Sequence, residues 1–570
     1  MNITINDRPV PCEPGDTVLT AARRAGIHIP SLCALDCSPI PHASCRVCVV
    51  EVEGENRLQT SCTLAVRDNL AIRTHTPRVQ RLRRIIVELL LASHPDDCLY
   101  CERAGDCELA RLAASVNVRG RRFGTGAKGH AVDVSSPAIC RDPNKCVQCG
   151  RCVTVCHREQ GVGAIDFAGR GFGTRVATGP DAGLNVSDCV FCGQCVRVCP
   201  TGALQEKSAV AQVAAALGDP DVTVVAQIAP AVTATVATEF GLRNVEDALK
   251  LVAGTLRRIG VDAVFDTSFT ADLTVVEEAN ELVKRIVDGG PLPLFTSCSP
   301  AWVRFVELHR PELIPNLSTC KSPQQMAAAL IRHHAEKIGN GRRIYSVSIM
   351  PCTAKKYEAV DVGDLDAVLT TRELYRLFDE FGVSLDGPGC DLAELDQPFG
   401  MASSSGRMFG GSGGVAEAAL RTAAHLLGES PQLGTAVISP LRSSDQVRMF
   451  QVTLGSHNLS CAVVSGLGAA RTLLDQLQRG DIKLDFVEVM SCAAGCVGGG
   501  GQPRCEPVEV ESRRTKLQEI DRHSRLRLAH ENPAVSALYA ELLGEPGSEI
   551  CHQLLHRSYD VDSTEVTNQG

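Results

Sequence analysis

The sequence predicts a multidomain protein of α+β and α/β type, with a small β-rich domain first, cysteine-rich domains next and a large α/β domain last. Its 570 residues exceed the ~250–300 residues at which a single core usually stops growing. Nineteen of its 27 cysteines fall into five groups spaced like metal ligands. After about residue 210, strand-like runs alternate with helical runs. We expect domains at 1–78, 79–125, 126–209 and 210–570.

Composition and charge restrict the class of protein. The net charge is −9, with one Trp and six Tyr, so neither a basic face nor a set of stacking aromatics favours nucleic acid. The N-terminus MNITINDRPV lacks the basic and apolar regions of a secretory signal. We therefore expect a cytoplasmic protein, and in a reducing compartment dense Cys-x-x-Cys patterns indicate metal rather than disulfides.

The most apolar stretch, VTVVAQIAPAVTATVATEF from Val222, has nearly the length of a membrane span. Gln227, Pro230 and the many β-branched residues instead favour a buried strand followed by a turn. We expect no membrane span.

Residues 1–78 alternate in NITIND, CVVEVEG and NLAIRT, which predicts short strands. Two close thiolates and two distant ones suit a [2Fe–2S] cluster, although a zinc site also accepts four thiolates. The last cysteine stands just before a strand, a setting similar to plant-type ferredoxins, which favours iron and implies a β-grasp domain. The expected ligands are Cys33, Cys45, Cys48 and Cys62.

The run RVQRLRRIIVELLLASH predicts a helix with arginines on the face opposite its apolar residues. Such a basic face either binds a partner or membrane surface or is simply solvated. The helix leads to His94, which alone would be read as structural, but Cys98, Cys101 and Cys107 follow within a few residues. We expect these four residues to bind a [4Fe–4S] cluster, whose potential a neutral imidazole ligand raises.

Gly124, Gly126 and Gly129 in RGRRFGTGAKGHAV match the glycine spacing of dinucleotide-binding loops. No apolar strand precedes them and no helical pattern follows. The segment is predicted to be an ordinary loop.

The most specific spacing is C-x2-C-x2-C-x3-C, which occurs twice, the second time followed by Pro200. This is the signature of bacterial ferredoxins with two [4Fe–4S] clusters, in which the fourth cysteine of each run binds the other cluster. Cys199 should therefore complete the site of Cys146, Cys149 and Cys152. Cys156 should complete the site of Cys189, Cys192 and Cys195.

Residues 210–570 contain six strand-like runs: VTVVAQIAP, DAVFDTS, LPLFTSC, YSVSIMP, TAVISP and DFVEVMSC. Three of them lead into loops with cysteines, TSCSPAW, MPCTAKKYE and EVMSCAAGCVGGGGQP. Because ligands bind beyond the carboxyl ends of strands in open α/β sheets, these loops are expected to converge on one site.

These three loops resemble the signature loops of the iron-only, or [FeFe], hydrogenases, and the N-terminal cluster domains match the larger members. The resemblance implies an H-cluster, a [4Fe–4S] cubane joined through one cysteine to a diiron unit that carries CO, CN⁻ and azadithiolate. It also implies the reaction 2H⁺ + 2e⁻ ⇌ H₂. Cys352, Cys492 and Cys496 are the implied cubane ligands, and Cys496 is the bridging one.

Other residues in these loops suit the same cofactor. A cation at Lys355, three residues beyond Cys352, suits an anionic ligand such as cyanide, although an ordinary surface lysine would look the same. By type, Met350, Met490 and Phe409 are more often core residues. The resemblance implies that they and Pro230 form an apolar wall around the diiron unit.

Proton transfer to a buried metal site needs a chain of titratable groups. Two glutamates three residues apart share one helix face, with an arginine one turn later, which would ordinarily indicate a surface salt bridge. Glu278 lies 20 residues before Cys298 and Ser318 lies 20 residues after it, and both separations match the family's proton path. The resemblance therefore implies a relay of Cys298, Glu278, Ser318 and Glu281, with Arg285 at its outer end.

One residue departs from the family pattern, in which the first loop reads Thr-Ser-Cys-Cys-Pro. Here Ser299 follows Cys298. Either Ser299 is the fourth cubane ligand, or the loop shifts by about one Cα step, ~3.8 Å, and Cys298 binds at the expense of the relay. We favour Ser299, because the rest of the relay is intact.

The sequence thus predicts a hydrogenase that exchanges electrons with ferredoxin through one [2Fe–2S] and three [4Fe–4S] clusters. Alternatively, the chain is the hydrogen-handling subunit of an NAD(P)-linked complex, possibly electron-bifurcating, with flavin and nucleotide held by partner subunits. A third reading is a non-catalytic iron–sulfur protein for cluster assembly or H₂ sensing. H-cluster maturation proteins are further expected partners, and helices after about residue 530 are expected to pack over the last domain.

Overall fold

The computed structural model describes residues 1–35, 43–124, 129–179, 182–387 and 391–559. These residues divide into two units, which are described separately. The first comprises Met1–His157, Gly163–Ser187 and Val198–Gln205, and the second Arg158–Val162, Asp188–Arg197 and Glu206–Gly570. The predicted domain boundaries remain predictions.

The first unit begins with a mixed sheet in the order β2-β1-β5-β3-β4. β1 pairs antiparallel with β2 and parallel with β5. Helix α1 begins with a capping box between Thr17 and Thr20. The three predicted strands are confirmed. The bounds are β1 Asn2–Ile5, β2 Arg8–Pro11, α1 Val18–Arg24, β3 Val49–Val52, β4 Gln59–Thr60 and β5 Ala71–Arg73.

The predicted arginine-bearing helix is α2 (Pro77–Ala92), which begins with Thr76 as N-cap and Pro77 in the first turn. Its face is not uniformly solvated, because Arg83 is buried and donates a 2.8 Å hydrogen bond to the carbonyl of Val49. The remaining elements of this unit are short: α3 Glu108–Ser115, β6 Ile139–Arg141, α4 Arg151–Thr154, β7 Asp166–Ala168 and β8 Arg175–Ala177. Gly124 lies outside helices and strands, and residues 125–128 of the glycine loop lie outside the described residues.

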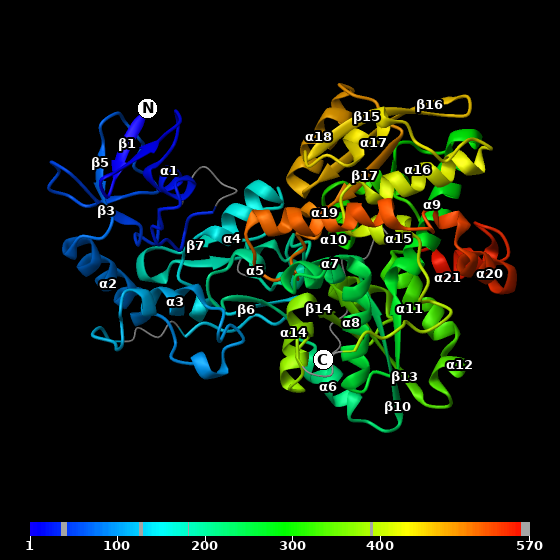
Figure 1. Ribbon diagram of the computed structural model, residues 1–570, viewed down its shortest axis with the longest axis horizontal. Coiled ribbons are helices and arrows are strands. Elements are labelled where there is room, and N and C mark those ends of the chain that lie inside the picture. The colour runs from blue at the N-terminus through cyan, green and yellow to red at the C-terminus, as the bar shows by residue number, and fades with distance from the viewer. Residues whose placement is uncertain (36–42, 125–128, 180–181, 388–390, 560–570) are drawn as a thin grey trace. The chain divides into compact units, whose positions relative to one another are not determined.

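The second unit is built on two sheets with helices packed around them (Figure 1). The first sheet is parallel throughout, in the order β11-β10-β13-β14, and the second has the order β12-β17-β16-β15 with only β15 antiparallel. The strands are β10 Val222–Ile228, β11 Ala263–Asp266, β12 Leu294–Phe295, β13 Arg343–Met350, β14 Ala367–Thr370, β15 Val447–Leu454, β16 His457–Ser465, β17 Phe486–Met490 and β18 Ala493–Cys496.

Helices cover these sheets and include a long α9 and a final group after residue 506. The bounds are α6 Val210–Leu217, α7 Pro230–Glu239, α8 Val245–Arg258, α9 Thr267–Asp288, α10 Pro300–His309, α11 Pro323–His333, α12 Ala335–Gly339, α13 Ala354–Val362, α14 Thr371–Glu380, α15 Ser404–Arg407, α16 Gly414–Leu426, α17 Thr435–Leu441, α18 Leu467–Arg479, α19 Pro507–His523, α20 Pro533–Leu538 and α21 Glu549–Leu555. α5 (Gln194–Val198) lies within the second run of cluster cysteines.

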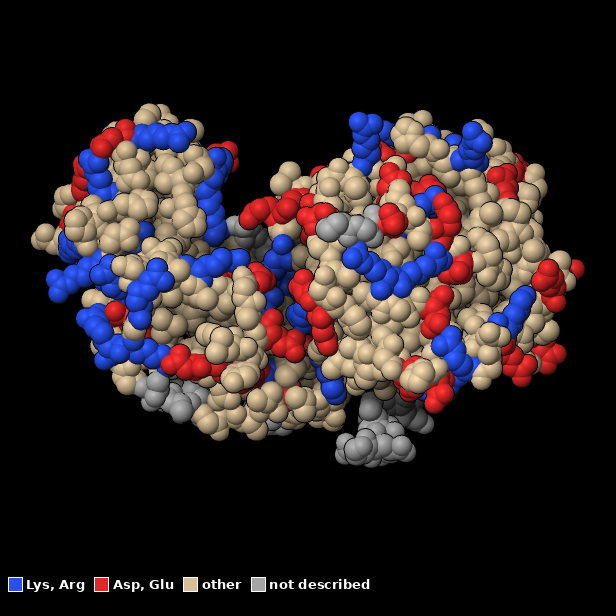
Figure 2. All heavy atoms as spheres, turned by 60° about the horizontal axis from the view of Figure 1, so that its bottom comes forward, with Lys and Arg blue, Asp and Glu red and all other residues tan. Residues whose placement is uncertain are grey.

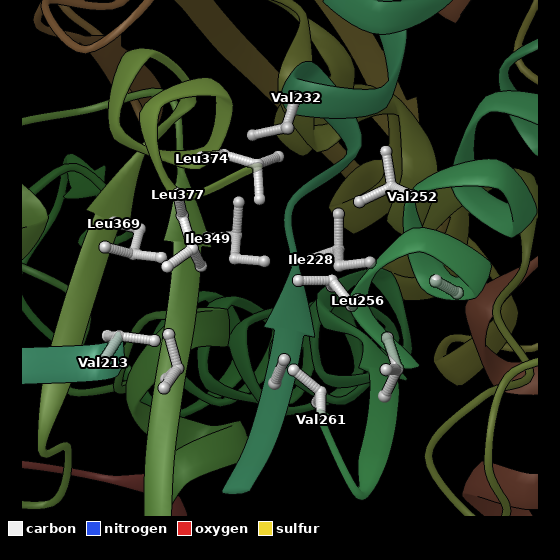
Figure 3. Close-up of a cluster of buried hydrophobic side chains, with 14 of the residues drawn as sticks. Val213, Ile228, Val232, Val252, Leu256, Val261, Ile349, Leu369, Leu374 and Leu377 are labelled. Atoms are coloured by element: carbon white, nitrogen blue, oxygen red, sulfur yellow. The ribbon is translucent and has the colours of Figure 1, made fainter. Parts of the chain in front are cut away.

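The register of the parallel sheet aligns apolar side chains across neighbouring strands. Ile228 pairs with Ile349, which pairs with Leu369, and all three are fully buried. Figure 3 shows them beside Leu374 and Val252, which the covering helices contribute. Each such side chain contributes ~1.5–3 kcal/mol on burial, so the cluster holds the strand ends in fixed positions.

Two expectations for the second unit need correction. TAVISP is not a strand but helix α17, because Val437 and Leu441 are buried four residues apart on one face. The strand of this region comes next, at β15, where exposed and buried residues alternate, and it forms a hairpin with β16. The stretch from Val222 is the buried strand β10 as predicted, followed by helix α7 rather than a simple turn.

Over the described part of the chain, no helix combines the length and the apolar character needed to cross a membrane. Figure 2 shows Lys and Arg interspersed with Asp and Glu on the face drawn. Charges of opposite sign at close range partly cancel each other's field.

Candidate active site and cluster ligands

The three cysteine loops follow the carboxyl ends of β12, β13 and β17, as predicted. Cys352 comes two residues after the last residue of β13, and Cys492 two residues after the last residue of β17. Cys496 is the last residue of β18, which returns from the same loop. The fold therefore joins segments that lie far apart in the sequence.

Cys352, Cys492 and Cys496 lie close enough for each sulfur's charge to affect its neighbours. Burial and, to a smaller extent, the nearby Cys492 raise the pKa of Cys352 to about 12. Burial, Cys352 and Cys492 likewise raise the pKa of Cys496 to about 12. Thiols with these pKa values stay protonated until a metal displaces the proton, and a set of soft thiolates suits an iron–sulfur cluster.

Glycines let the backbone close tightly around these cysteines. A Cβ atom on Gly499 would lie 2.2 Å from the carbonyl oxygen of Pro351, and one on Gly501 would lie 3.0 Å from the backbone nitrogen of Cys352. Only glycine permits such approaches. The glycine run thus packs the third loop against the second.

Gln194 contacts Cys492, and sequence reasoning did not predict this contact. Its side-chain amide donates to Cys492 Sγ at 3.1 Å and to the carbonyl of Gly498 at 3.0 Å. It lies between Cys192 and Cys195 of the ferredoxin-like run, and the charge of Cys492 also raises the pKa of Cys192, after the larger effect of burial. One amide therefore connects the last relay group to the catalytic loop, and no spacing rule signals it.

In the first loop, the two adjacent residues contact different neighbours. Ser299 Oγ lies 2.7 Å from Ser491 Oγ, next to Cys492. Burial raises the pKa of Cys298, and the nearby carboxylate of Glu278 raises it further. Ser299 thus contacts the third cysteine loop, whereas Cys298 lies near both Glu278 of the predicted relay and Cys496.

Lys355 is a buried lysine rather than a surface one. Its ammonium donates to Glu358 Oε2 at 2.8 Å, to Glu358 Oε1 at 3.1 Å and to the carbonyl of Cys298 at 3.2 Å. Glu358 also accepts from Ser322 Oγ and Gln324 Nε2, both at 2.9 Å. The spacing of Lys355 and Glu358 on α13 is a signal that could have identified this pair.

Three residues of the predicted apolar wall, Met350, Met490 and Phe409, are buried but belong to two clusters, and Pro230 is only partly buried. Met350 packs in the core of the parallel sheet, whereas Met490 and Phe409 pack together in another core group, against which Cys298 and Cys496 lie. Pro230 begins α7, directly after β10.

Three of the predicted relay residues, Ser318 and the α9 residues Glu281 and Arg285, are joined by hydrogen bonds. Ser318 Oγ donates to Glu281 Oε2 at 2.8 Å, and Arg285 donates to Glu281 Oε1 at 2.6 Å. The alternative of a surface salt bridge therefore applies only to Glu281 and Arg285, and even these two side chains are largely enclosed. Glu278 takes no part in this ion pair.

Glu278 is fully buried, and neither of its carboxyl oxygens has a partner with good hydrogen-bond geometry. Burial and, to a smaller extent, the charge of Glu281 raise the pKa of Glu278, while Ser318 and the backbone of Ser297 lower it, and the net pKa is about 8. A carboxyl group with a pKa near neutrality can both accept and release a proton.

The cysteines of the N-terminal sheet lie together and are buried. The side chain of Cys33 contacts those of Cys45 and Cys62, and Cys48 contacts Cys62. The backbone N–H of Leu32 donates to Cys45 Sγ at 3.4 Å, a hydrogen bond of the kind that tunes cluster potential.

One ring nitrogen of His94 contacts the backbone. Its Nδ1 lies 3.1 Å from the carbonyl oxygen of Pro95, a contact of the kind that orients metal-binding histidines and that agrees with the predicted role. Burial raises the pKa of Cys107, and the nearby Cys101 and Cys98 also raise it, to a smaller extent. The four predicted ligands of this group thus occupy one region of the first unit.

Within the first unit, Cys199 lies with the first run of the ferredoxin pattern. One cavity is lined by Cys146, Cys149, Cys152 and Cys199. The other predicted set combines Cys156 of the first unit with Cys189, Cys192 and Cys195 of the second, and it stays a prediction.

Known protein families match nearly the whole chain. Residues 222–500 match the iron-only hydrogenase large subunit, C-terminal domain, and residues 508–561 match the iron hydrogenase small subunit. The remaining matches are the 2Fe-2S iron-sulfur cluster binding domain over 1–77, the NADH-ubiquinone oxidoreductase-G iron-sulfur binding region over 83–122 and the 4Fe-4S dicluster domain over 145–203.

Two relatives align with the chain over almost their full length. The NADP-reducing hydrogenase subunit HndD of Solidesulfovibrio fructosivorans is 41% identical and covers 98% of each chain. Iron hydrogenase 1 of Clostridium pasteurianum is 34% identical and covers 98% of this chain and 99% of its own. A cytosolic Fe-S cluster assembly factor, narfl of Xenopus tropicalis, is 31% identical but covers only 61% of this chain and 76% of its own.

A solved structure supports the same assignment. A single-residue variant of the apo [FeFe]-hydrogenase HydA1 from Chlamydomonas reinhardtii is 38% identical, with a TM-score of 0.54 over 62% of this chain and 99% of that one. Full-length similarity to hydrogenases and the matched cluster domains agree with the geometry of the three loops. The chain therefore belongs to the iron-only, or [FeFe], hydrogenase family and is a hydrogenase with N-terminal iron–sulfur domains.

Proposed function

We propose that this chain catalyses 2H⁺ + 2e⁻ ⇌ H₂ at an H-cluster held by Cys352, Cys492, Cys496 and Ser299. When bound, this cluster supplies the metal centre at which protons and electrons combine. The observation that carries the proposal is the proximity of Cys352, Cys492 and Cys496 at the ends of β13, β17 and β18, together with a line of acid and hydroxyl groups.

Different residues of the chain would then transfer protons, place a positive charge near the cluster and exclude water. Cys298 and Glu278 hold and pass protons near the cluster, while Ser318, Glu281 and Arg285 connect them to the surface. Lys355 places a buried positive charge beside the first loop, where it suits an anionic ligand. Met350, Met490, Phe409 and Pro230 exclude water from the diiron unit.

Ser299 is proposed as the fourth cubane ligand. The contact of its hydroxyl with Ser491, beside Cys492, supports this choice, as does the proximity of Cys298 to Glu278. The alternative, in which Cys298 ligates and leaves the relay, predicts that Ser299→Ala keeps the cubane.

Electrons are proposed to travel through one [2Fe–2S] and three [4Fe–4S] clusters. We assign the first to a β-grasp, plant-type ferredoxin domain and two others to a bacterial ferredoxin-type domain, because their cysteine spacings and matched families agree. The third [4Fe–4S] cluster takes His94, Cys98, Cys101 and Cys107. Gln194 supports a direct step from the last relay cluster to the cubane.

Two electron partners are proposed. One is ferredoxin, and the other is an NAD(P)-linked flavoprotein assembly in which this chain is the hydrogen-handling subunit. The second is favoured by the full-length similarity to the NADP-reducing hydrogenase subunit. A cytoplasmic location and H-cluster maturation proteins complete the proposal, since iron–sulfur thiolates need reducing conditions.

The test is hydrogen formation by the matured chain. With a reduced one-electron dye as donor, H₂ should form and Cys496→Ala should abolish it. Reduced ferredoxin and NADPH are then supplied separately. Activity with ferredoxin alone favours the first partner, and a requirement for added flavoprotein subunits favours the second. No H₂ from a chain that carries all its iron would refute the proposed function.

A further inference from the structure

The last described residues of the chain run beside the relay residues. His556 and Cys320 form an antiparallel bridge, in which the N–H of Lys321 donates to the carbonyl of Leu555 and the N–H of Arg557 donates to the carbonyl of Thr319, both at 2.8 Å. Residues 555–559, named here the C-terminal strap, are therefore attached by backbone to residues 318–321.

Tyr559 fixes the backbone of Ser318. Its hydroxyl donates to the carbonyl oxygen of Ser318 at 2.8 Å, while the Ser318 hydroxyl donates to Glu281 Oε2 at 2.8 Å. The relay serine is therefore held on its main-chain side by the strap and on its side-chain side by the relay. Neither contact makes Tyr559 part of the proton path, because a carbonyl oxygen has no proton to pass on.

His556 fixes the next residue. Its Nδ1 lies 2.8 Å from Thr319 Oγ1, and its Nε2 lies 3.0 Å from Glu277 Oε2. Thr319 in turn donates its backbone N–H to Glu281 Oε2 at 3.1 Å. Glu277 precedes Glu278 on α9 and also accepts from Tyr539 and from the backbone of Gly547. The imidazole thus ties α9 to the segment that faces it.

We propose that Tyr559 and His556 are positioning residues of the proton path, which the C-terminal strap holds at proton-transfer distance. The inference rests on the proposed function for its catalytic meaning, but its structural content concerns only the described contacts. A displacement of one ångström is enough to slow a reaction severely when a proton must cross a fixed gap. The strap therefore serves the relay without being a member of it.

Two substitutions distinguish the contact made by Nδ1 of His556 from the contact made by its Nε2. In His556→Asn the amide takes the place of Nδ1 and keeps the contact with Thr319, whereas in His556→Gln it takes the place of Nε2 and keeps the contact with Glu277. Because Thr319 is the residue that contacts Glu281, His556→Asn should stay close to the parent. His556→Gln and Tyr559→Phe should each slow H₂ formation about tenfold, the effect of losing one well-placed hydrogen bond.

Tyr375→Phe is the matched control, since it removes a tyrosine hydroxyl that donates to a different acceptor, the carboxylate of Glu239, at 2.6 Å. The first readout is turnover, with KM for the electron donor and the solvent isotope effect measured alongside. KM should stay unchanged and the isotope effect should rise in Tyr559→Phe and His556→Gln. A general loss of folding would lower cluster content and also affect the control.

The second readout does not need the H-cluster. The infrared band of the protonated Glu278 carboxyl group, identified by its absence in Glu278→Gln, is measured in the unmatured chain. It should shift in Tyr559→Phe and His556→Gln and stay in place in His556→Asn and Tyr375→Phe. An unshifted band, or turnover within twofold of the parent in both strap variants, overturns the inference. If the parent itself makes no H₂ while the band shifts as expected, the positioning stands and the proposed function fails.

Discussion

The N-terminal cysteine group and the catalytic cysteine group are assembled in different ways. Cys33, Cys45, Cys48 and Cys62 lie on one short stretch of chain and contact one another directly. Cys352, Cys492 and Cys496 come from strands of two different sheets, and their neighbours include Gln194 and Lys355. A local site depends on spacing, and a site built by the fold depends on every element that positions its strand ends.

The largest difference between the two groups should appear on removing one thiol from each. Cys492→Ala removes a cubane ligand and should abolish H₂ formation. Cys33→Ala affects only the proposed [2Fe–2S] site, so activity with a small dye should persist while activity with a protein donor falls. The assay is H₂ formation with both donors, normalised to iron content. Equal losses with both donors would contradict the separation of relay and catalytic site.

Glu278→Gln should have the next largest effect. The substitution keeps the shape of the side chain but cannot carry a proton, so turnover should fall ~10²–10⁴-fold. The infrared bands of the matured site should stay unchanged, because Glu278 is not a ligand. Turnover close to the parent would mean that protons reach the site by another route.

Breaking the buried pair of Lys355 and Glu358 should destabilise the second unit. Removing one partner of a buried ion pair costs about 3–5 kcal/mol, and Glu358 carries hydrogen bonds from Ser322 and Gln324 as well. Lys355→Met should therefore lower the urea midpoint more than Lys355→Met combined with Glu358→Gln. The exposed pair of Lys250 and Glu394 is the control, and Lys250→Met should cost about 0–1 kcal/mol.

The buried Glu278 should make the stability of the second unit depend on pH. Its pKa rises from 4.5 to about 8 on folding, so between these values the folded chain holds a proton that the unfolded chain has lost. Stability therefore falls as pH rises through this window. Glu278→Gln removes this loss, so its advantage over the parent in thermal unfolding should grow from pH 5 to pH 8, by about 2–4 kcal/mol. A constant difference across this range would contradict the raised pKa.

The smallest expected effect is a change in redox potential on removing the hydrogen bond from Gln194 to Cys492. Gln194 donates to Cys492 Sγ, and hydrogen bonds to cluster sulfurs influence the potential. Gln194→Leu should lower the cubane potential by about 40 mV, the equivalent of one hydrogen bond of ~1 kcal/mol. A redox titration followed by electron paramagnetic resonance measures this, and an unchanged potential would mean that the amide only packs.

The same comparison explains which features the sequence could predict. Cysteine spacing predicted the relay groups, and strand-like runs ending in cysteines predicted that the three loops follow strand ends, because both signals are local. TAVISP was misjudged because a short apolar run fits helix and strand equally well, although the alternation over Val447–Leu454 could have revealed β15.

Spacing rules could not predict contacts between segments that are distant in the sequence. Gln194 contacts Cys492, and Tyr559 contacts Ser318, only because the fold places them side by side. The hydroxyl contact of Ser299 with Ser491 has the same origin. Such partners carry no periodicity or motif, so a structure was needed to find them.

Infrared spectroscopy of the matured chain would detect the H-cluster itself, because CO and CN⁻ ligands absorb where the protein does not. We expect bands of both ligands in the native chain. We also expect them to persist with altered frequencies in Ser299→Cys, since that substitution changes the proposed fourth cubane ligand. A fully iron-loaded chain without CO and CN⁻ bands would contradict the assignment of these loops to an H-cluster.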